Sequence, residues 1–246
     1  MTARVLVVGS AGRMGRAVID AAAGRGEVAI AAAVDRGDDL GAGLDACDVY
    51  VDFSSPESTR AAAIAATPRR RAAVIGTTGL QRGDDEAIAA LCQVAPVVVA
   101  ANFSLGVNLV LGLARQAARV LGPDWDAEVV ETHHRAKRDA PSGTALAIAR
   151  AIASGHGSDY EAVKRHARDG DVGARPRGEI GVSAVRGGDV IGEHVAYFFG
   201  PAERVEIAHR ASSRAIFAAG SLRAAAWVVG KPPGRYDMLD VLGFTA

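Results

Sequence analysis

A glycine turn that joins an apolar run to a helical segment near the N-terminus is the feature that most constrains the fold of this chain. Residues 4–8 (RVLVV) form a short apolar run, which predicts a strand buried on both faces of a parallel sheet. Gly9, Gly12 and Gly15 follow at once, and residues 16–23 predict a helix. Such glycines let the backbone approach a pyrophosphate, and the helix N-terminus offers it free N–H groups. The order of strand, glycine turn and helix therefore predicts a dinucleotide-binding fold.

An acidic residue follows the second predicted strand, at the position where dinucleotide folds bind the adenosine ribose. Residues 28–34 predict that strand, and Asp35 ends it, about 20 residues after the glycine turn. A carboxylate there favours the free 2′-hydroxyl of NADH, whereas the guanidinium groups of Arg13 and Arg36 attract the 2′-phosphate of NADPH. We therefore expect the chain to use both NADH and NADPH, with a preference below about a thousandfold, or about 4 kcal/mol.

Three more apolar runs predict strands at residues 49–53, 72–75 and 96–100. Ser55 with Pro56 marks the start of the helix after the first of these strands, and Asp84 is expected to cap the helix after the second. The carboxyl ends of these strands are expected at one edge of a parallel sheet, where ligands bind in open α/β folds. The turn of Gly76, Thr77 and Thr78 at that edge suits a nicotinamide carboxamide, although an ordinary tight loop explains the same residues equally well.

The pattern changes at Ser104, where we place the first domain boundary. A long helix follows, whose apolar face is expected to consist of Gly106, Val110, Leu113, Ala117 and Val120. Further on, the chain predicts a strand at 127–132, a helix at 143–153, an antiparallel hairpin of 180–186 with 190–199, a strand at 204–209 and a helix at 214–229. The expected fold is α/β, with a Rossmann-type parallel-sheet nucleotide domain plus an α+β mixed-sheet substrate domain.

Residues 131–144 (ETHHRAKRDAPSGT) concentrate chemistry that suits a small substrate with carboxylates. His133 and His134 offer imidazoles, Lys137 offers an ammonium, and Ser142 caps a helix whose N-terminus can bind an anion. The lysine stands out because the only lysines are Lys137, Lys164 and Lys231 among 28 basic residues, and an ammonium can give up a proton where a guanidinium cannot. The competing interpretation is a solvated charged loop.

Composition excludes several other classes of function. Basic and acidic residues balance at 28 each, so neither nucleic acid nor an anionic membrane surface is expected as a partner. Cys47 and Cys92 lack CxxC spacing, and no histidine or carboxylate spacing indicates a metal site, so no metal is expected. The chain contains neither an apolar run of about 18 residues nor a secretory leader, and we expect a cytoplasmic protein.

Seven motifs occur in an order that resembles the 4-hydroxy-tetrahydrodipicolinate reductase (dihydrodipicolinate reductase) family. They are GSAGRMG at 9–15, GTTG at 76–79, ANFS at 101–104, HHRAK at 133–137, DAPSGT at 139–144, RGGDVIGEH at 186–194 and YDMLDVL at 236–242. The resemblance covers nearly the whole chain. It implies reduction of an unsaturated dipicolinate-type ring, with loss of water, by hydride from NADH or NADPH in lysine and diaminopimelate biosynthesis.

The resemblance also implies roles for residues and domains. His133 and Lys137 correspond to the acid–base residue and the proton donor, and the substrate contacts correspond to His134, Ser142, Gly143 and Thr144. The implied cofactor contacts are Gly9, Ser10, Ala11, Gly12, Arg13, Met14, Asp35, Arg36, Gly76, Thr77, Thr78, Ala100, Ala101, Asn102 and Phe103. Residues 1–104 with 214–246 would form the dinucleotide-binding domain, and 105–213 would form the substrate-binding and oligomerisation domain of a homotetramer.

Two other functions remain open at the level of the sequence. One is another NAD(P)-dependent amino-acid dehydrogenase of the aspartate or homoserine type, and the other is a non-catalytic NAD(H)-sensing protein. The run of two histidines and a lysine before Pro141-Ser142-Gly143-Thr144 argues against both, and in a non-catalytic sensor these polar groups would serve no purpose.

Overall fold

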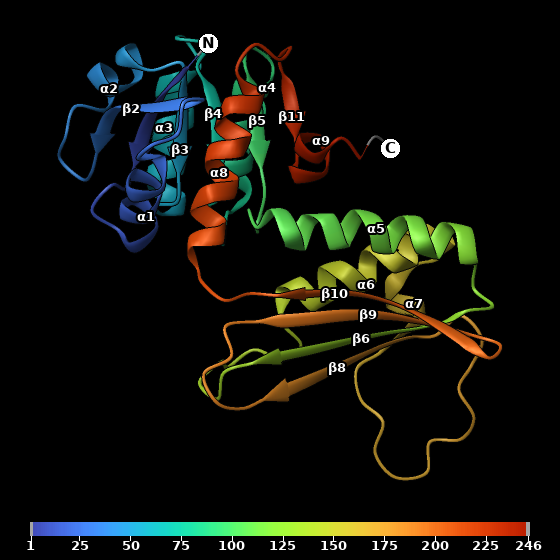
Figure 1. Cartoon of the computed structure of the whole chain (residues 1–246). Helices are drawn as coiled ribbons and strands as arrows, with labels where there is room; N and C mark the ends of the chain where they lie inside the picture. The colour runs from blue at the N-terminus through green and yellow to red at the C-terminus, as the bar shows by residue number, and fades with distance from the viewer. Residues whose placement is uncertain (1, 245–246) are drawn as a thin grey trace. The chain divides into compact units, whose positions relative to one another are not determined.

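The computed structural model describes residues 2–244 and divides the chain into two compact units (Figure 1). The first unit consists of Met1–Leu105 and Ala215–Ala246, and the second unit consists of Gly106–Arg214. No helix within residues 2–244 combines the length and the apolarity needed to cross a membrane.

The first unit contains a six-stranded sheet in which every strand runs parallel to its neighbours. Its strands are β1 (Ala3–Val8), β2 (Val28–Val34), β3 (Val49–Asp52), β4 (Ala72–Ile75), β5 (Pro96–Val99) and β11 (Gly234–Tyr236). Their order across the sheet is β11-β5-β4-β3-β1-β2. Five of these strands are confirmed sequence predictions. The sixth strand, β11, was not predicted, because its three residues are too few to show the alternation of apolar and polar side chains that indicates a strand.

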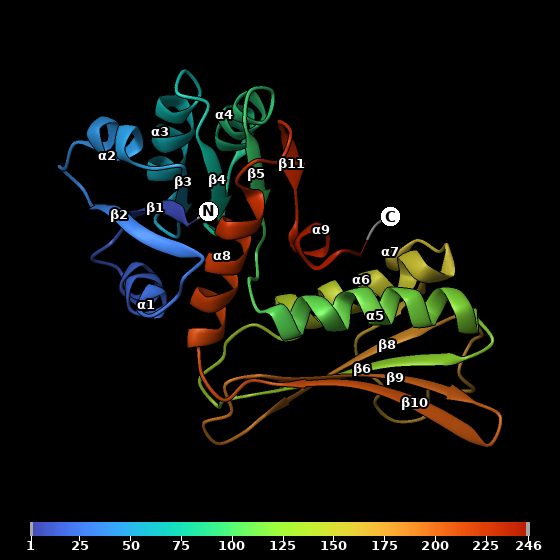
Figure 2. The ribbon, with the colours of Figure 1, turned by 45° about the horizontal axis from the view of Figure 1, so that its top comes forward.

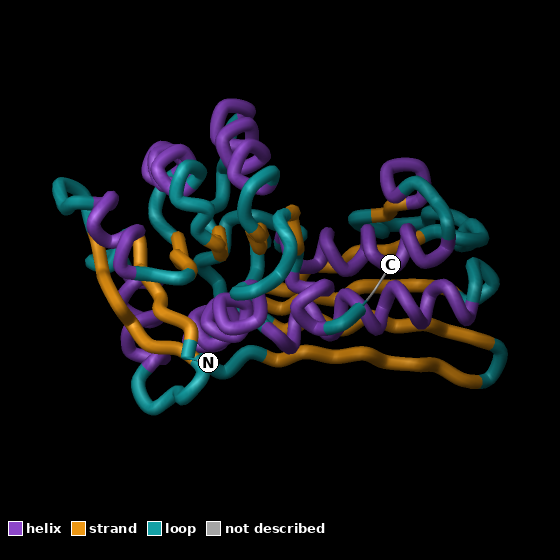
Figure 3. Tube along the Cα trace, turned by 90° about the horizontal axis from the view of Figure 1, so that it is seen from above, coloured by secondary structure: helices purple, strands orange, loops and turns teal. Residues whose placement is uncertain are grey.

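Helices cover both faces of this sheet (Figure 3). They are α1 (Arg13–Ala22), α2 (Leu40–Ala46), α3 (Pro56–Ala66), α4 (Arg82–Cys92), α8 (Ala215–Val228) and α9 (Met238–Leu242). Val5 and Val7 pack with α1, α8 and α9, whereas Leu6 and Val8 pack with α2, α3 and α4. Successive side chains of a strand point to opposite faces, so a continuously apolar strand fits a sheet with a core on each side.

One predicted helix cap in the first unit is confirmed and another is wrong. Ser55 caps α3 as predicted, with Pro56 at the first helical position. Asp84 was expected to cap α4 but stands inside its first turn, since the helix already begins at Arg82. The Asp84 carboxylate accepts a hydrogen bond from the Gln81 N–H at 2.8 Å, which is the returning half of a capping box.

The second unit contains a mixed five-stranded sheet with helices on one face (Figure 2). Its strands are β6 (Asp126–His133), β7 (Lys164–Arg165), β8 (Ile180–Arg186), β9 (Glu193–Gly200) and β10 (Glu203–Arg210), and its helices are α5 (Leu105–Leu121), α6 (Gly143–His156) and α7 (Tyr160–Val163). The order is β10-β9-β6-β8-β7, with β6 parallel to β8 and antiparallel to β9. The predicted fold class, a parallel-sheet unit joined to a mixed-sheet unit, is confirmed.

Two predictions for the second unit are wrong. Strands β8 and β9 do not form a hairpin, because β6 lies between them and pairs with both; the hairpin is formed by β9 and β10. The buried face of α5 includes Val107, Val110, Ala114 and Ala118, whereas Val120 of the predicted face is 75% exposed. Several faces of this alanine- and leucine-rich helix are apolar, and only the packing partner decides which one is buried.

Candidate active site

In the first unit, the glycine turn packs closely against the first helix, α1. Gly9 has a left-handed φ of 76°, and a side chain there would place Cβ 2.9 Å from Ser54 Cβ. A Cβ on Gly15 would lie 2.2 Å from the Gly9 carbonyl oxygen, so α1 packs directly against the turn. Gly12 precedes α1 without a side-chain cap. The first N–H groups of α1 therefore remain available for an anion, as a bound pyrophosphate requires.

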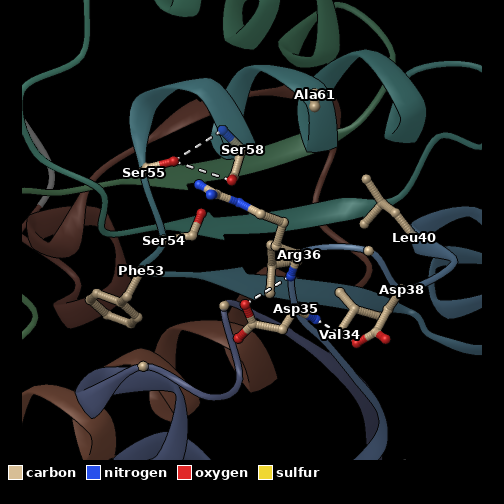
Figure 4. A pocket seen from close by; sticks show the side chains of 14 residues that line it. Val34, Asp35, Arg36, Asp38, Leu40, Phe53, Ser54, Ser55, Ser58 and Ala61 are labelled. Carbon is tan, nitrogen blue, oxygen red and sulfur yellow. Dashed lines mark hydrogen bonds between the residues drawn. The ribbon is translucent and has the colours of Figure 1, made fainter.

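A cavity of about 480 Å³ opens where β1, β2 and β3 end (Figure 4). Gly9, Gly12, Asp35 and Arg36 line it, and all four were predicted cofactor contacts. Sequence reasoning missed three hydroxyl groups in the same lining, those of Ser54, Ser55 and Ser58. Their position directly after β3, at the carboxyl edge of the sheet, was a usable signal.

Asp35 is fixed as a carboxylate at the rim of this cavity. Its Oδ1 accepts the Arg36 N–H and its Oδ2 accepts the Ala11 N–H, each at 2.8 Å. These two backbone N–H groups hold the pKa of the Asp35 carboxyl below its ordinary value. The Arg36 side chain extends toward Ser55 and Ser58 in Figure 4. The cavity thus holds both a carboxylate suited to a ribose hydroxyl and a guanidinium suited to a phosphate.

The turns after β4 and β5 lie outside the lining of this cavity, and part of their side-chain chemistry is used within the protein. Thr77 is buried, and its hydroxyl accepts a hydrogen bond from Thr59 at 2.8 Å, whereas Thr78 is exposed. Phe103 is 1% exposed and packs edge-on against Phe53, with ring centroids 5.4 Å apart. The phenyl ring of Phe103 is therefore a core group, and only the backbone at that position can contact a ligand.

The second unit carries a buried acid–base cluster at the carboxyl end of β6. Inward-facing positions of this strand change from apolar, at Ala127 and Val129, to titratable, at Glu131 and His133. His133 Nδ1 lies 2.5 Å from Glu131 Oε2, and the Glu131 side chain is fully buried. Sequence reasoning missed Glu131, although its spacing of two residues from His133 places both on one face of a strand.

Arg186 at the end of β8 and Ser142 at the start of α6 complete the surroundings of Glu131. The Arg186 guanidinium donates to both carboxylate oxygens at 2.7 and 2.8 Å, and the Ser142 N–H donates to Oε1 at 2.9 Å. Burial raises the pKa of Glu131, but the hydrogen bonds from Arg186, His133 and Ser142 outweigh it and leave that pKa below its ordinary value. Glu131 is therefore a carboxylate at neutral pH.

His194 closes the cluster from β9. It is 4% exposed, its ring meets that of His133 edge-to-face at 5.2 Å between centroids, and its Nε2 lies 3.1 Å from Ser142 Oγ. Ser142 Oγ also accepts the Ala145 N–H at 3.1 Å, as the predicted cap of α6. Burial, with the nearby His133 as a smaller cause, lowers the pKa of His194 to about 4. His194 is therefore buried and stays neutral at pH 7.

The remaining predicted residues of the second unit lie in the loop between β6 and α6 or in the first turn of α6. Lys137 Nζ forms an ion pair with Asp139 Oδ2 at 2.9 Å, a partner that the sequence did not reveal. Nothing lies within 4 Å of a Cβ built on Gly143, which is exposed at the first turn of α6 beside the half-buried Thr144. Gly143 at the start of α6 is therefore open to a ligand. The adjacent Ser142 N–H bonds to the Glu131 carboxylate that also contacts His133 Nδ1.

A parallel-sheet unit with a glycine turn, joined to a second unit with its own acid–base cluster, is the organisation of a dinucleotide-dependent oxidoreductase. Comparison with known families makes this specific: the chain belongs to the dihydrodipicolinate reductase family. The family's N-terminal model matches residues 3–103, and its C-terminal model matches residues 106–242. The resemblance seen in the sequence is thereby confirmed and is favoured over an aspartate- or homoserine-type dehydrogenase or an NAD(H) sensor.

Individual relatives match over the full chain. The 4-hydroxy-tetrahydrodipicolinate reductase of Alkalilimnicola ehrlichii is 46% identical, with 99% of this chain and 100% of the relative covered. The enzyme of the same name from Geobacter metallireducens is 42% identical, with 98% of each chain covered. Among solved structures, a dipicolinate-bound dihydrodipicolinate reductase from Paenisporosarcina sp. TG-14 shares the fold, with a TM-score of 0.82 and 24% identity over 98% of this chain and 99% of that one.

Proposed function

We propose that the chain reduces 4-hydroxy-tetrahydrodipicolinate to tetrahydrodipicolinate in lysine and diaminopimelate biosynthesis, with NADH or NADPH as the hydride donor. The observation that carries this proposal is the end-to-end similarity to reductases of that name, which spans both units. In the balanced reaction the ring gains one hydride and one proton, one water leaves, and oxidised NAD⁺ or NADP⁺ remains. The protein must therefore hold the dinucleotide, bind a dicarboxylate and deliver a proton.

The first unit is the proposed dinucleotide-binding domain. The uncapped start of α1 and the glycine turn suit the pyrophosphate, and Asp35 with Arg36 in the cavity suits the adenosine ribose with or without its phosphate. The full set of proposed contacts is Gly9, Ser10, Ala11, Gly12, Arg13, Met14, Asp35, Arg36, Gly76, Thr77, Thr78, Ala100, Ala101, Asn102 and Phe103. A dinucleotide bound at these residues supplies the hydride.

The second unit is the proposed substrate-binding domain. The substrate's two carboxylates need cations and N–H donors, which the start of α6 at Gly143 and Thr144 offers together with Ser142, His134 and Lys137. Hydride addition to a ring carbon leaves enamine-like negative charge that must gain a proton. His133, the acid–base residue of the buried cluster, and Lys137 are the proposed proton carriers.

The uncovered face of the second sheet supports a homotetramer as part of this proposal. Helices α5 and α6 cover one face, and within the second unit no described helix covers the other (Figure 2). Val195 lies on an interior strand of that other face, in register with Val130 and Ala208, and Tyr197 stacks on Phe199 further along the same strand. Such a partly apolar sheet face suits contact between copies of the chain.

We place the enzyme in the cytoplasm, with the cofactor pool it uses.

A coupled assay tests the proposed reaction. Aspartate semialdehyde, pyruvate and the synthase that condenses them generate the unstable substrate in place, while NADH or NADPH consumption is followed by absorbance. We expect turnover with both cofactors and a preference below about a thousandfold in kcat/KM. Cofactor consumption no faster than in a reaction without the chain would reject the proposal.

Dipicolinate, which is bound in the solved relative, serves as a stable dicarboxylate probe. We expect it to inhibit competitively against substrate, because its two carboxylates match the donors at the start of α6. Inhibition that is competitive only against NADH would place the dicarboxylate site elsewhere.

A further inference from the structure

The Glu131 carboxylate accepts hydrogen bonds from donors on three different elements. Oε2 faces His133 Nδ1 of β6 and Arg186 Nη1 of β8, and Oε1 faces Arg186 Nη2 and the Ser142 N–H at the start of α6. A carboxylate offers about four lone-pair positions, so these four contacts occupy it completely. Glu131 cannot bind substrate or exchange a proton without breaking one of them, and it must act through the groups it holds.

The contact with Glu131 fixes which nitrogen of His133 can exchange a proton. A buried, ionised carboxylate accepts hydrogen bonds only, so Nδ1 must carry the hydrogen in its 2.5 Å contact with Oε2. Nε2 then remains for exchange, and no residue within 2–244 hydrogen-bonds to it. Gly192 preserves the space beside this nitrogen, since a Cβ there would lie 2.9 Å from Nε2.

Charged groups of both signs lie around His133. The Glu131 carboxylate on the same strand contacts its ring, and the guanidinium of Arg186 from β8 partly cancels the charge of that carboxylate. His194 from β9 is neutral at pH 7 and adds no charge, and Lys137 in the loop is paired with Asp139. Glu131 is therefore the group whose removal should disfavour the imidazolium most.

The same carboxylate also holds the proposed anion-binding turn. The Ser142 N–H that bonds to Oε1 belongs to the N-cap of α6, directly before Gly143 and Thr144. One side chain thus connects the proton-carrying ring to the helix start that faces the substrate's carboxylates.

We propose that Glu131 is the positioning residue of this site, which fixes His133 for proton exchange at Nε2 and holds the start of α6 through Ser142. This inference rests on the proposed function of the chain. It extends that function by assigning a role to a buried residue that touches neither cofactor nor substrate.

The first test uses the wild-type protein and needs no catalysis. NMR of ¹⁵N-histidine-labelled protein, with His133→Gln to assign the signal, reports the two ring nitrogens of His133 across pH 5 to 9. We expect Nδ1 to carry the hydrogen of the neutral ring. A neutral ring protonated at Nε2 would overturn the inference, whether or not the chain has reductase activity.

The second test compares variants in the coupled assay. Glu131→Gln keeps the length of the side chain but removes its charge. We therefore expect kcat to fall about a hundredfold, and we expect the limb of the kcat–pH profile that depends on His133 to move to lower pH. Arg186→Met should move that limb to higher pH, because it leaves the Glu131 charge uncancelled. Glu131→Asp keeps the charge with shorter reach, and we expect it to recover part of kcat with a raised KM for the substrate.

A purely structural role for Glu131 predicts a different outcome. Glu131→Gln and Arg186→Met would then both have a lower melting temperature, but the pH profile of kcat would not shift in either variant. That outcome would overturn the inference. Glu128→Gln is the matched control, since Glu128 lies on the same strand and pairs with Arg168 and Arg175 instead of His133. An inactive wild type would reject the proposed function instead, and the NMR result would still decide the role of Glu131.

Discussion

Lys137 is a partly buried ammonium, 21% exposed at its side chain, and it lies 2.9 Å from the Asp139 carboxylate. This contact is the main cause that lowers the pKa of Asp139, so the two groups form an ion pair at neutral pH. Lys137→Met keeps the aliphatic stem and removes the charge and the proton. We expect kcat to fall by about a hundredfold or more, with NADH affinity unchanged, because the proposed cofactor contacts lie in the first unit. Steady-state kinetics and NADH fluorescence titration measure both quantities.

Asp139→Asn is the control for this change, because it removes the partner and leaves the ammonium in place. Its effect on kcat should be clearly smaller than that of Lys137→Met. Loss of NADH binding in Lys137→Met would mean that Lys137 supports the fold and does not serve the reaction.

His194 makes stability depend on pH through its burial. Its pKa is about 4 in the folded chain against an ordinary value of 6.5, so the unfolded chain binds more protons between these values. The contribution of His194 to the free energy of unfolding is therefore fully present above about pH 6.5. It is lost as the pH falls toward 4, by up to about 3 kcal/mol. Burial lowers the pKa of His156 as well, which acts in the same direction. Urea unfolding of wild type and His194→Gln between pH 7 and 4.5 should show a weaker pH dependence in the variant, and equal slopes would contradict this.

Helix α8 returns the chain to the first unit and depends on one glycine for its docking. A Cβ on Gly220 would lie 1.7 Å from the Phe103 carbonyl oxygen, within the same unit. Alanine favours the helix by up to about 1 kcal/mol, but a backbone clash at a buried position costs about 1–3 kcal/mol or more. We therefore expect Gly220→Ala to lower the free energy of unfolding in urea.

Gly83→Ala in α4 is the matched change with the opposite expected sign. The nearest atom to its Cβ is the tip of Arg60 at 3.4 Å, so alanine fits and should raise stability by up to about 1 kcal/mol. If Gly220→Ala unfolds at the same urea concentration as wild type, α8 cannot lie as close to Phe103 as described.

Elements with a local signal could be predicted from the sequence, and those defined by their neighbours could not. The glycine turn before α1, the Ser55 cap of α3 and the Ser142 cap of α6 each depend on residues adjacent in the chain. Strand β8 was paired with the wrong neighbour, because alternation shows which side chains share a face but not which strand lies alongside. A glycine-containing connection between two strands is compatible with a hairpin and also with a strand inserted between them.

The candidate site divides in the same way. His133, Lys137 and Ser142 fall within one short stretch and were found by their chemistry together. Arg186 and His194 reach the same cluster from β8 and β9, and only the order of strands brings them to Glu131 and Ser142. A lone glutamate in a predicted strand gives no sign that its partner stands 55 residues further along.

The proposed assembly of the whole molecule depends on the sheet face that α5 and α6 leave uncovered in the second unit. Val195 lies on an interior strand of that face, between Val130 and Ala208. A lysine there would place a charge within the proposed contact between copies, where a buried unpaired charge is strongly unfavourable. We expect wild type to sediment with the mass of four chains and Val195→Lys to sediment as smaller species that are still folded. Val205→Lys is the control, because Val205 is in register with Phe198 of the helix-covered face and is already 38% exposed. A wild type that sediments as one chain, or a Val195→Lys variant that keeps the mass of four, would show that this face is not the contact surface.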